Sequence, residues 1–304
     1  MSRPSLACVG AGRLARALLP LAAEAGYPVV AIAARRSATA RALSRRFSGA
    51  RATGVEALAG AARLLLVAVP DRHIAGVAER LAAVDAVDWS GCVVLHHAGA
   101  LGTEPLRPLA RAGAEVGVLH PLQTLGRGAR AAQHLPGSRA RLEGSPGALR
   151  AARRLARDVG LVPLGGSADW SAADRALYHA VASMVSNDVT ALVARGTELL
   201  ESLGVPRRAA LDGLTALAAG TVEQARADGL EAALTGPLVR GDVATVEAQL
   251  RALRRRSRAA AELHARLLEE LLRAAEAAGA APPAPQRRRL RALLRAGRGP
   301  GRTV

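Results

Sequence analysis

Residues 5–16 form an apolar run that is followed by Gly10-x-Gly12-x-x-Ala15 and by the start of an amphipathic helix. This order predicts a strand, a tight turn and a helix. A buried strand would turn sharply at Gly10, and Gly12 has no side chain to keep a pyrophosphate away from the backbone. Ala15 lets the helix lie close to the sheet, and the helix N-terminus directs N–H groups and a positive dipole end at the phosphates. We therefore predict a dinucleotide-binding turn; the alternative is a turn with a purely structural role. The predicted cofactor-binding residues are Gly10, Gly12, Arg13, Leu14 and Ala15.

The second apolar run, residues 28–34, ends in Arg35-Arg36-Ser37. A site for NAD needs an acidic side chain here to accept hydrogen bonds from the ribose hydroxyls, whereas guanidinium groups suit the extra 2′-phosphate of NADP. We predict that Arg35, Arg36 and Ser37 bind this phosphate and that the cofactor is NADP (NADPH). The alternative is that both arginines are merely solvated, since arginine is abundant throughout the chain.

Strand and helix patterns alternate up to about Gly166. Apolar runs predict strands at 5–10, 28–34, 63–69, 92–97 and 114–119, with weaker runs near 139–143 and 161–164. Amphipathic stretches predict helices at 12–25, 37–47, 71–86, 103–112 and 146–159. This alternation is typical of a doubly wound sheet, so the predicted fold class is an α/β Rossmann-type parallel sheet domain followed by an all-α C-terminal domain.

Beyond Gly166 the strand patterns stop. One long helix is predicted over 169–204, with Ser171-x-x-Asp174 as a capping box. Further helices are predicted over about 206–227 and from Asp242, and the last helix, over 257–278, is predicted to run to about Gly279. We predict an NADP-binding Rossmann-like domain at 1–166 and an all-helical domain for substrate binding and dimerisation at 167–280. Residues 281–304 are predicted to be a basic, disordered tail, with a short basic helix over 287–296 as a variant of this prediction.

The composition excludes several classes of protein. A formal net charge of +17 accompanies only 2% aromatic residues, so few side chains can stack on bases and no nucleic-acid partner is expected. All 42 basic residues are arginine, so acid–base chemistry must use His, a carboxylate, Tyr or Cys. Cys8 and Cys92 lie in strand-like runs without metal-ligand spacing, which predicts buried thiols and no metal. No apolar stretch reaches the roughly 18 residues of a membrane span, and no signal peptide is recognisable, so a cytoplasmic protein without a membrane partner is expected.

Polar side chains follow three of the predicted strands. Val69-Pro70-Asp71 is predicted to contact the nicotinamide half of the cofactor, since ligands bind beyond the carboxyl ends of such strands. The pair His96-His97 is predicted to be structural, because successive strand residues point to opposite faces. His120 ends a buried strand and would donate either an N–H to a loop carbonyl or a proton to a substrate. Gln123, which follows it, is predicted to bind substrate.

The long helix and one loop carry further polar groups. His179, Ser183, Ser186 and Thr190 fall within an arc of about 60° on an otherwise apolar helix. Asn187 flanks this stripe, and a mid-helix Asn disfavours the helix unless it makes a specific contact. The alternative is a polar stripe that faces water. In the loop 234–242, a hydroxyl, backbone N–H groups and a guanidinium precede a helix, so a carboxylate site is predicted. Its residues are Thr235, Gly236 and Arg240.

The order of these motifs resembles one bacterial family. The motifs are GxGxxA at 10–15, VAVPD at 67–71, HxxGAL at 96–101, HPLQT at 120–124, YHA at 178–180 with SN at 186–187, and ALTGP at 233–237 with RGD at 240–242. Members of this family combine a Rossmann-like domain with domain of unknown function 2520. The family is similar in plan to pyrroline-5-carboxylate reductase, prephenate dehydrogenase and ketopantoate reductase.

The resemblance implies an NADP-dependent oxidoreductase that reduces a small 2-oxo acid, with ketopantoate in pantothenate biosynthesis as the specific candidate and a homodimer formed through the helical domain. Such relatives often carry Lys-x-x-x-Asn where this chain has Ser183 and Asn187, so His179 is the predicted replacement for the lysine acid. His179 or His120 is thus the predicted acid, and Asn187 and Ser183 are predicted to position the substrate. The family often has Ser at Ala98 and Phe at Leu125. The alternative function is a non-catalytic NADP-binding regulator or sensor.

Overall fold

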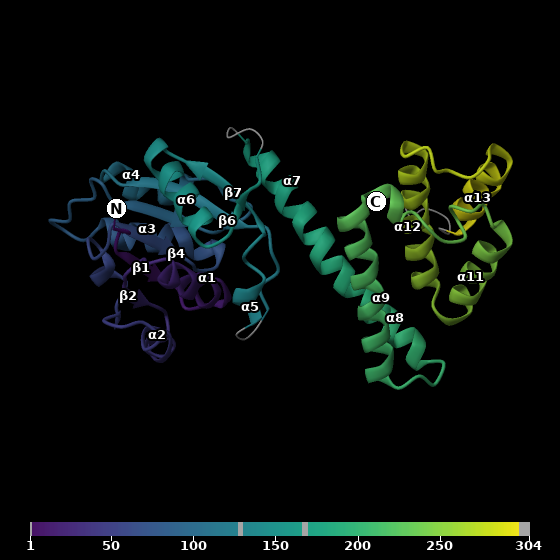
Figure 1. The fold of residues 1–304 in the computed structure, drawn as a ribbon, viewed down its shortest axis with the longest axis horizontal. Coiled ribbons are helices and arrows are strands. Elements are labelled where there is room, and N and C mark those ends of the chain that lie inside the picture. The colour runs from purple at the N-terminus through teal and green to yellow at the C-terminus, as the bar shows by residue number, and fades with distance from the viewer. Residues whose placement is uncertain (1, 127–129, 166–169, 298–304) are drawn as a thin grey trace. The chain divides into compact units, whose positions relative to one another are not determined.

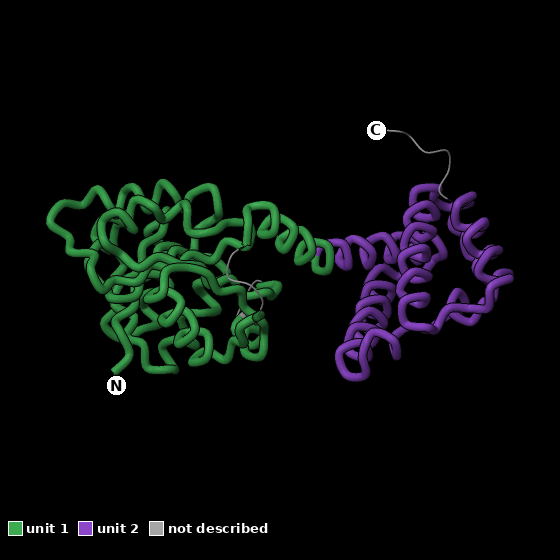
Figure 2. Tube along the Cα trace, turned by 90° about the horizontal axis from the view of Figure 1, so that it is seen from above, with its two compact units in different colours: residues 1–186 green, residues 187–304 purple. Residues whose placement is uncertain are grey.

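The computed structural model describes residues 2–126, 130–165 and 170–297. The chain divides into two compact units, Met1–Ser186 and Asn187–Val304, which are described separately (Figure 2). The division lies within the long predicted helix and not at the predicted boundary of 166/167. The reason is that helix α7 (Ala172–Ser183) is tied to the sheet of unit 1 by the side-chain contacts described below.

Unit 1 contains an eight-stranded sheet with the order β3-β2-β1-β4-β5-β6-β7-β8 (Figure 1). The strands are β1 (Leu6–Val9), β2 (Val29–Ala33), β3 (Arg51–Thr53), β4 (Leu64–Val67), β5 (Val93–His96), β6 (Glu115–Pro121), β7 (Arg139–Gly144) and β8 (Val162–Pro163). All pairs from β3 to β6 are parallel, which confirms the Rossmann-type sheet. Every predicted strand is present, and only β3 is additional, because three residues at a sheet edge leave no readable pattern.

Helices cover both faces of the sheet, which explains the uninterrupted apolar strands. Leu6 and Cys8 pack in one core with helices α1, α2 and α6, while Ala7 and Val9 pack in a second core with α3 and α4. All four strand residues are at most 2% exposed. These helices are α1 (Arg13–Glu24), α2 (Ser37–Ser44), α3 (Ile74–Ala82), α4 (Arg107–Arg111) and α6 (Pro146–Asp158). With both faces filled, the carboxyl edge of the strands is the place left for a large ligand.

Strand β7 departs from the predicted parallel sheet because it runs antiparallel to β6. A parallel neighbour needs a crossover that normally packs a helix on the sheet, whereas the described part of this connection holds only the four-residue helix α5 (Arg130–Gln133). The antiparallel register places Arg141 opposite His120 and Glu143 opposite Val118. The unpredicted direction of β7 therefore brings a charged pair next to a predicted site residue.

The predicted helix over 169–204 is present as α7, a π-helical segment Met184–Asp188, and α8 (Val189–Glu201). The predicted capping box is confirmed: Asp174 N donates to Ser171 Oγ at 3.1 Å, and Ser171 N donates to the Asp174 carboxylate at 2.8 Å. Asn187 lies in the π-helical segment. Such segments often occur at functional sites, and their wider turn re-aims the side chains they carry.

The described part of unit 2 consists of helices joined by loops, as predicted for the C-terminal region. The helices after α8 are α9 (Arg207–Asp228), α10 (Leu230–Ala233), α11 (Val243–Arg256), α12 (Arg258–Ala277) and α13 (Ala284–Gly297). The predicted start of a helix at Asp242 is confirmed, because its carboxylate accepts the Thr245 N–H at 3.0 Å. The last predicted helix, over 257–278, is present as α12, since Ser257 ends α11 and its hydroxyl caps α12 by accepting the Ala260 N–H at 3.2 Å.

The predicted disordered tail is wrong over 284–297, where the chain forms α13, whereas the short basic helix predicted over 287–296 is confirmed. Leu290 and Leu294 stand one turn apart, are fully buried, and pack in one core with α11 and α12. Arg291 also pairs with Glu276 of α12 at 2.6 Å. The charge of this segment predicted exposure to solvent, whereas the two leucines at helical spacing attach it to the core of unit 2. Residues 298–304 of the predicted tail lie outside the described residues.

No helix in the described part of the chain is long and apolar enough to cross a membrane.

Candidate functional site

The glycine turn lies at the carboxyl end of β1, as predicted. Gly10 has φ +117°, and a Cβ atom on it would lie 2.1 Å from the backbone oxygen of Ala68, so only glycine fits. Gly12 begins α1 with open space around it, since no atom lies within 4 Å of the position of a Cβ. No side chain caps this helix, and its first turn holds no acidic residue. The turn is therefore a cradle whose helix N-terminus is available to an anion.

The other residues of this turn divide between the surface and the core. Arg13 is exposed and Leu14 is half-buried. Ala15, in the first turn of α1, is 2% exposed and belongs to the same core as Leu6 and Cys8 of β1, as the close approach of helix and sheet requires. Arg13 and Leu14 can therefore contact a ligand in the cradle, whereas Ala15 acts through packing.

Arg35, Arg36 and Ser37 lie at the same edge, beyond β2. The Gly10 N–H donates to the Ala33 carbonyl at 2.7 Å, which ties the glycine turn to the end of β2. All three residues are exposed. Within the described ranges neither arginine forms an ion pair with a carboxylate, so both are available to an anion such as a 2′-phosphate.

Val69, Pro70 and Asp71 complete this part of the edge. They follow β4, whose end is joined to β1 by the bond from the Ala68 N–H to the Val9 carbonyl at 2.7 Å. Asp71 begins a short 3₁₀-helix that ends at His73. The order β2-β1-β4 thus brings together the predicted phosphate-binding and nicotinamide-binding residues from three separate stretches of sequence.

His96 and His97 are held by backbone groups. The Ala98 N–H donates to His96 Nδ1 at 3.1 Å, so His96 Nε2 carries the proton that it donates to the Gly102 carbonyl at 2.6 Å. Burial lowers the pKa of His96 and lowers that of His97 to about 4. His97 Nδ1 donates to the Leu119 carbonyl at 2.6 Å. Both imidazoles are neutral near pH 7 and shape the loop that follows β5.

His120 and His179 both lie against the side of Gly99 where a side chain would stand. A Cβ atom on Gly99 would lie 2.7 Å from His179 Nδ1 and 2.9 Å from His120 Nε2. The two imidazole rings are edge to face, with centroids 6.4 Å apart. The absence of a side chain at Gly99 therefore permits the two histidines to approach each other from β6 and α7.

Tyr178, which was not predicted, fixes the His120 ring. The Tyr178 hydroxyl and His120 Nδ1 share a hydrogen bond of 2.9 Å. Burial, and then the neighbouring positive charge of Arg141, lower the pKa of His120 to about 3. His120 is thus a neutral imidazole near pH 7, while His179 is exposed. Of the two predicted acids, His179 is the one whose side chain is exposed to solvent.

Arg141 and Glu143 attach α7 to the sheet. Arg141 Nη2 donates to the Leu101 carbonyl at 2.7 Å, and its Nη1 pairs with Glu143. The Arg141 Cζ lies 5.7 Å from the centroid of the Trp170 ring. Arg175 Nε of α7 donates to the same Glu143 carboxylate at 3.0 Å. One buried carboxylate therefore binds two guanidinium groups and sets the position of the helix that carries Tyr178 and His179.

Sequence reasoning missed this cluster because its members come from β6, β7 and α7. One signal was available, since Arg141 and Glu143 alternate within a strand and must share a face, where two charges are costly unless paired. Tyr178 was visible only as the neighbour of a predicted residue. The direction of β7, which brings the cluster together, had no local signature.

The remaining predicted residues are divided between the two units. Gln123 is exposed, and its amide donates to the His134 carbonyl at 3.1 Å and to Ser138 Oγ at 3.0 Å, so it stabilises the connection between β6 and β7. Ser183 ends α7 in unit 1. Asn187 and the loop with Thr235, Gly236 and Arg240 belong to unit 2. In that loop Gly236 has φ +96°, and Thr235 and Arg240 are exposed.

Comparisons with known proteins agree with this architecture. Residues 1–121 match the model of a Rossmann-like domain, and residues 139–275 match that of a domain of unknown function, DUF2520. No curated protein sequence matches the chain.

Solved structures resemble the chain over most of its length. A candidate NADP oxidoreductase from Bacteroides fragilis superposes with a TM-score of 0.68 at 20% identity, covering 88% of this chain and 98% of the other. A protein from Thermotoga maritima gives a TM-score of 0.65 at 24% identity, with 90% and 98% covered. A pyrroline-5-carboxylate reductase from Coxiella burnetii gives 0.57 at 17% identity, with 99% and 100% covered. At these identities the likeness establishes the fold.

Proposed function

We propose that this chain, a Rossmann-like domain followed by DUF2520, is an NADP-dependent oxidoreductase that reduces a C=O or C=N group of a small carboxylate. The observation that carries the proposal is one sheet edge in unit 1, where a glycine cradle and two arginines that pair with no carboxylate of the described residues lie at the ends of neighbouring strands. Structural neighbours of the chain include a pyrroline-5-carboxylate reductase and an imine reductase, which supports the same class.

The residues of this edge fit NADP in shape and charge. Gly10, Gly12 and the N-terminus of α1 would hold the pyrophosphate, and Arg35 with Arg36 would bind the 2′-phosphate. Val69, Pro70 and Asp71 would contact the nicotinamide half. When bound, the reduced cofactor supplies a hydride to the substrate carbon.

The acid in this proposal is His179. Adding a hydride to a ketone leaves a negative oxygen that must take up a proton, and the chain has no lysine to provide it. His179 is exposed and would donate that proton, whereas His120 is held neutral and would orient the site through its Tyr178 partner. Asn187 and Ser183 remain the predicted positioning donors.

For the substrate we propose a 2-oxo acid, with ketopantoate as the specific candidate. Thr235, Gly236 and Arg240 remain the predicted carboxylate-binding set, and Gln123 a predicted substrate contact. The test is NADPH oxidation, followed by absorbance, with purified protein and a panel of ketopantoate, other 2-oxo acids and cyclic imines. Turnover of one panel member establishes a reductase and its substrate class. Tight NADPH binding with no turnover of any member favours the alternative, an NADP-binding regulator or sensor.

Replacing Arg35 and Arg36 together by Ala is expected to weaken NADPH binding at least about tenfold and to leave NADH binding within about twofold, because only NADPH has the 2′-phosphate. Fluorescence titration of both nucleotides measures the two affinities. Arg45 and Arg46 form a matched control, because they are a second adjacent, exposed pair just beyond α2. Equal losses for NADPH and NADH, or the same loss in the control pair, would contradict the assignment.

We further propose a homodimer formed through the helical unit. Large apolar side chains there are exposed, among them Leu217 at 68% and Val222 at 61%. Light scattering is expected to give twice the chain mass of 31.2 kDa. The double substitution Leu217→Arg with Val222→Arg should yield monomers, whereas Asp212→Asn with Glu223→Gln makes the same change in charge on α9 and should remain dimeric. A monomeric wild type, or dimers of both variants, would refute this interface.

A further inference from the structure

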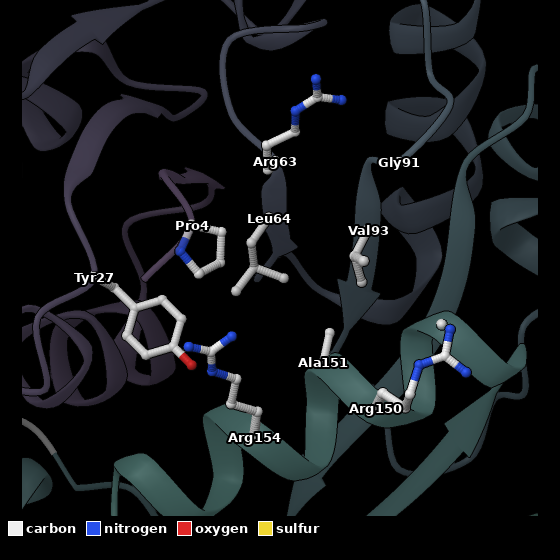
Figure 3. A pocket seen from close by; sticks show the side chains of 10 residues that line it. Pro4, Tyr27, Arg63, Leu64, Gly91, Val93, Arg150, Ala151 and Arg154 are labelled. Atoms are coloured by element: carbon white, nitrogen blue, oxygen red, sulfur yellow. The ribbon is translucent and has the colours of Figure 1, made fainter. Parts of the chain in front are cut away.

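A cavity of about 270 Å³ lies in unit 1 at the amino ends of β1, β4 and β5, where α6 passes over them (Figure 3). Pro4 precedes β1, Leu64 begins β4, and Val93 begins β5. These residues and Ala151 of α6 give the cavity an apolar lining, to which the ring of Tyr27 adds.

This cavity is separate from the proposed cofactor edge. Gly10 follows the last residue of β1, whereas Pro4 and Leu64 lie at the first residues of the same parallel strands. Four strand residues span about 13 Å at roughly 3.3 Å per residue. A ligand in the cavity would therefore occupy the end of the sheet opposite to the glycine turn.

Three arginines line the cavity. Arg63 directly precedes β4, and Arg150 and Arg154 stand one turn apart on α6, which places them on one face of that helix. None of the three forms an ion pair with a carboxylate of the described residues, and no acidic residue lines the cavity. Arg63 Nη1 donates only to the Ser90 carbonyl, at 3.0 Å.

The neighbouring carboxylates are occupied by other groups. Asp158, one turn after Arg154, accepts hydrogen bonds from Arg3 Nη2 and from the Tyr27 hydroxyl, each at 2.8 Å. Glu115 accepts from the Ser145 hydroxyl and from the Gly147 N–H. The positive charge around the cavity is therefore only partly offset, by the charges of Glu115 near Arg150 and of Asp88 near Arg63, neither of which forms an ion pair with these arginines.

We propose that this cavity binds a small organic phosphate, with the phosphate on Arg63, Arg150 and Arg154 and an apolar body against Leu64, Val93 and Ala151. Guanidinium groups match the geometry of phosphate oxygens, and two or three of them offset a dianion. The apolar lining selects a phosphate ester over a bare ion, because burying apolar surface adds to the affinity. This site does not depend on the proposed reductase activity.

The test is calorimetric titration of the full chain with phenyl phosphate and, separately, with inorganic phosphate. Phenyl phosphate is expected to bind at least about tenfold more tightly than inorganic phosphate. The double substitution Arg150→Gln with Arg154→Gln should lower the affinity for phenyl phosphate at least about tenfold. Arg153→Gln with Arg157→Gln is the matched control, because both residues are exposed on α6 and the change in charge is the same. This control should leave the affinity within about twofold.

Two more variants keep the test decisive. Arg63→Gln removes one guanidinium group outside α6 and should lower the affinity for phenyl phosphate. This variant keeps the proposal testable if the α6 double variant unfolds. Arg35→Ala with Arg36→Ala should leave phenyl phosphate binding unchanged. The proposal is overturned if phenyl phosphate does not bind, if inorganic phosphate binds equally well, or if Arg63→Gln and the α6 pair have no effect. Loss of binding in the Arg35 and Arg36 variant overturns it too, since the probe would then occupy the other edge.

Discussion

Replacing Gly10 by Ala is expected to destabilise unit 1 by about 3–5 kcal/mol and to abolish NADPH binding. Two effects combine, because a side chain at φ +117° is strained and its Cβ would lie 2.1 Å from the Ala68 oxygen. Strain at positive φ costs about 1–3 kcal/mol, and forced packing costs a similar amount. Backbone atoms of Ala68, just beyond β4, must move to admit the methyl group, so the turn that faces the phosphates is displaced as well.

Gly12→Ala is the matched control for this prediction. Nothing lies within 4 Å of a Cβ at Gly12, and its φ is −79°, so unit 1 should lose less than about 1 kcal/mol. NADPH affinity should nevertheless fall, because the methyl group enters the space that the pyrophosphate would use. Trp89 and Trp170 are the two tryptophans of the chain and both lie in unit 1, so urea unfolding followed by tryptophan fluorescence reports this unit. Equal stability of the two variants would contradict the packing argument.

Replacing His179 by Ala is expected to lower kcat for NADPH oxidation by about 100- to 10 000-fold, the range that a positioned acid contributes. Cofactor affinity and unfolding free energy should change little, since His179 is exposed on α7 and lies apart from the glycine turn in sequence. Steady-state kinetics on the substrate found by the panel, together with NADPH titration, separate these quantities. An unchanged kcat would remove His179 from the mechanism.

Two comparisons sharpen the His179 result. His134→Ala removes another exposed imidazole from unit 1, and its contacts with Ser138 and Gln123 are made by the backbone, so kcat should be unaffected. Tyr178→Phe keeps the ring but deletes the hydroxyl that orients His120. Its kcat is expected to fall about tenfold, less than that of His179→Ala, since only the orientation of a neutral imidazole is lost. A larger loss in Tyr178→Phe would make the tyrosine the stronger candidate for the acid.

The parts of the fold that could be predicted are those that depend on the spacing of apolar and capping residues within a short stretch of chain. Each long apolar run became a strand, and the capping box at Ser171 and the cap at Asp242 formed where the sequence placed them. The prediction of a disordered tail rested on its arginines. Residues 284–297 form a helix instead, because Leu290 and Leu294 stand one turn apart and are buried. The direction of β7 could not be predicted, because the same alternating strand pattern serves a parallel or an antiparallel neighbour.

For the candidate site, local sequence was enough to predict the glycine turn, the arginines beyond the second strand, and the residue types available for acid–base chemistry, because each is a property of a short stretch of chain. Which groups meet depends on the packing of distant segments. This packing joined His120 of β6 to Tyr178 of α7, and it placed Arg141 of β7 close enough to help lower the pKa of His120. It also gathered Arg63 and two arginines of α6 around one cavity. Proximity between distant segments and burial from water set protonation and charge balance, and neither is encoded in the spacing of neighbouring residues.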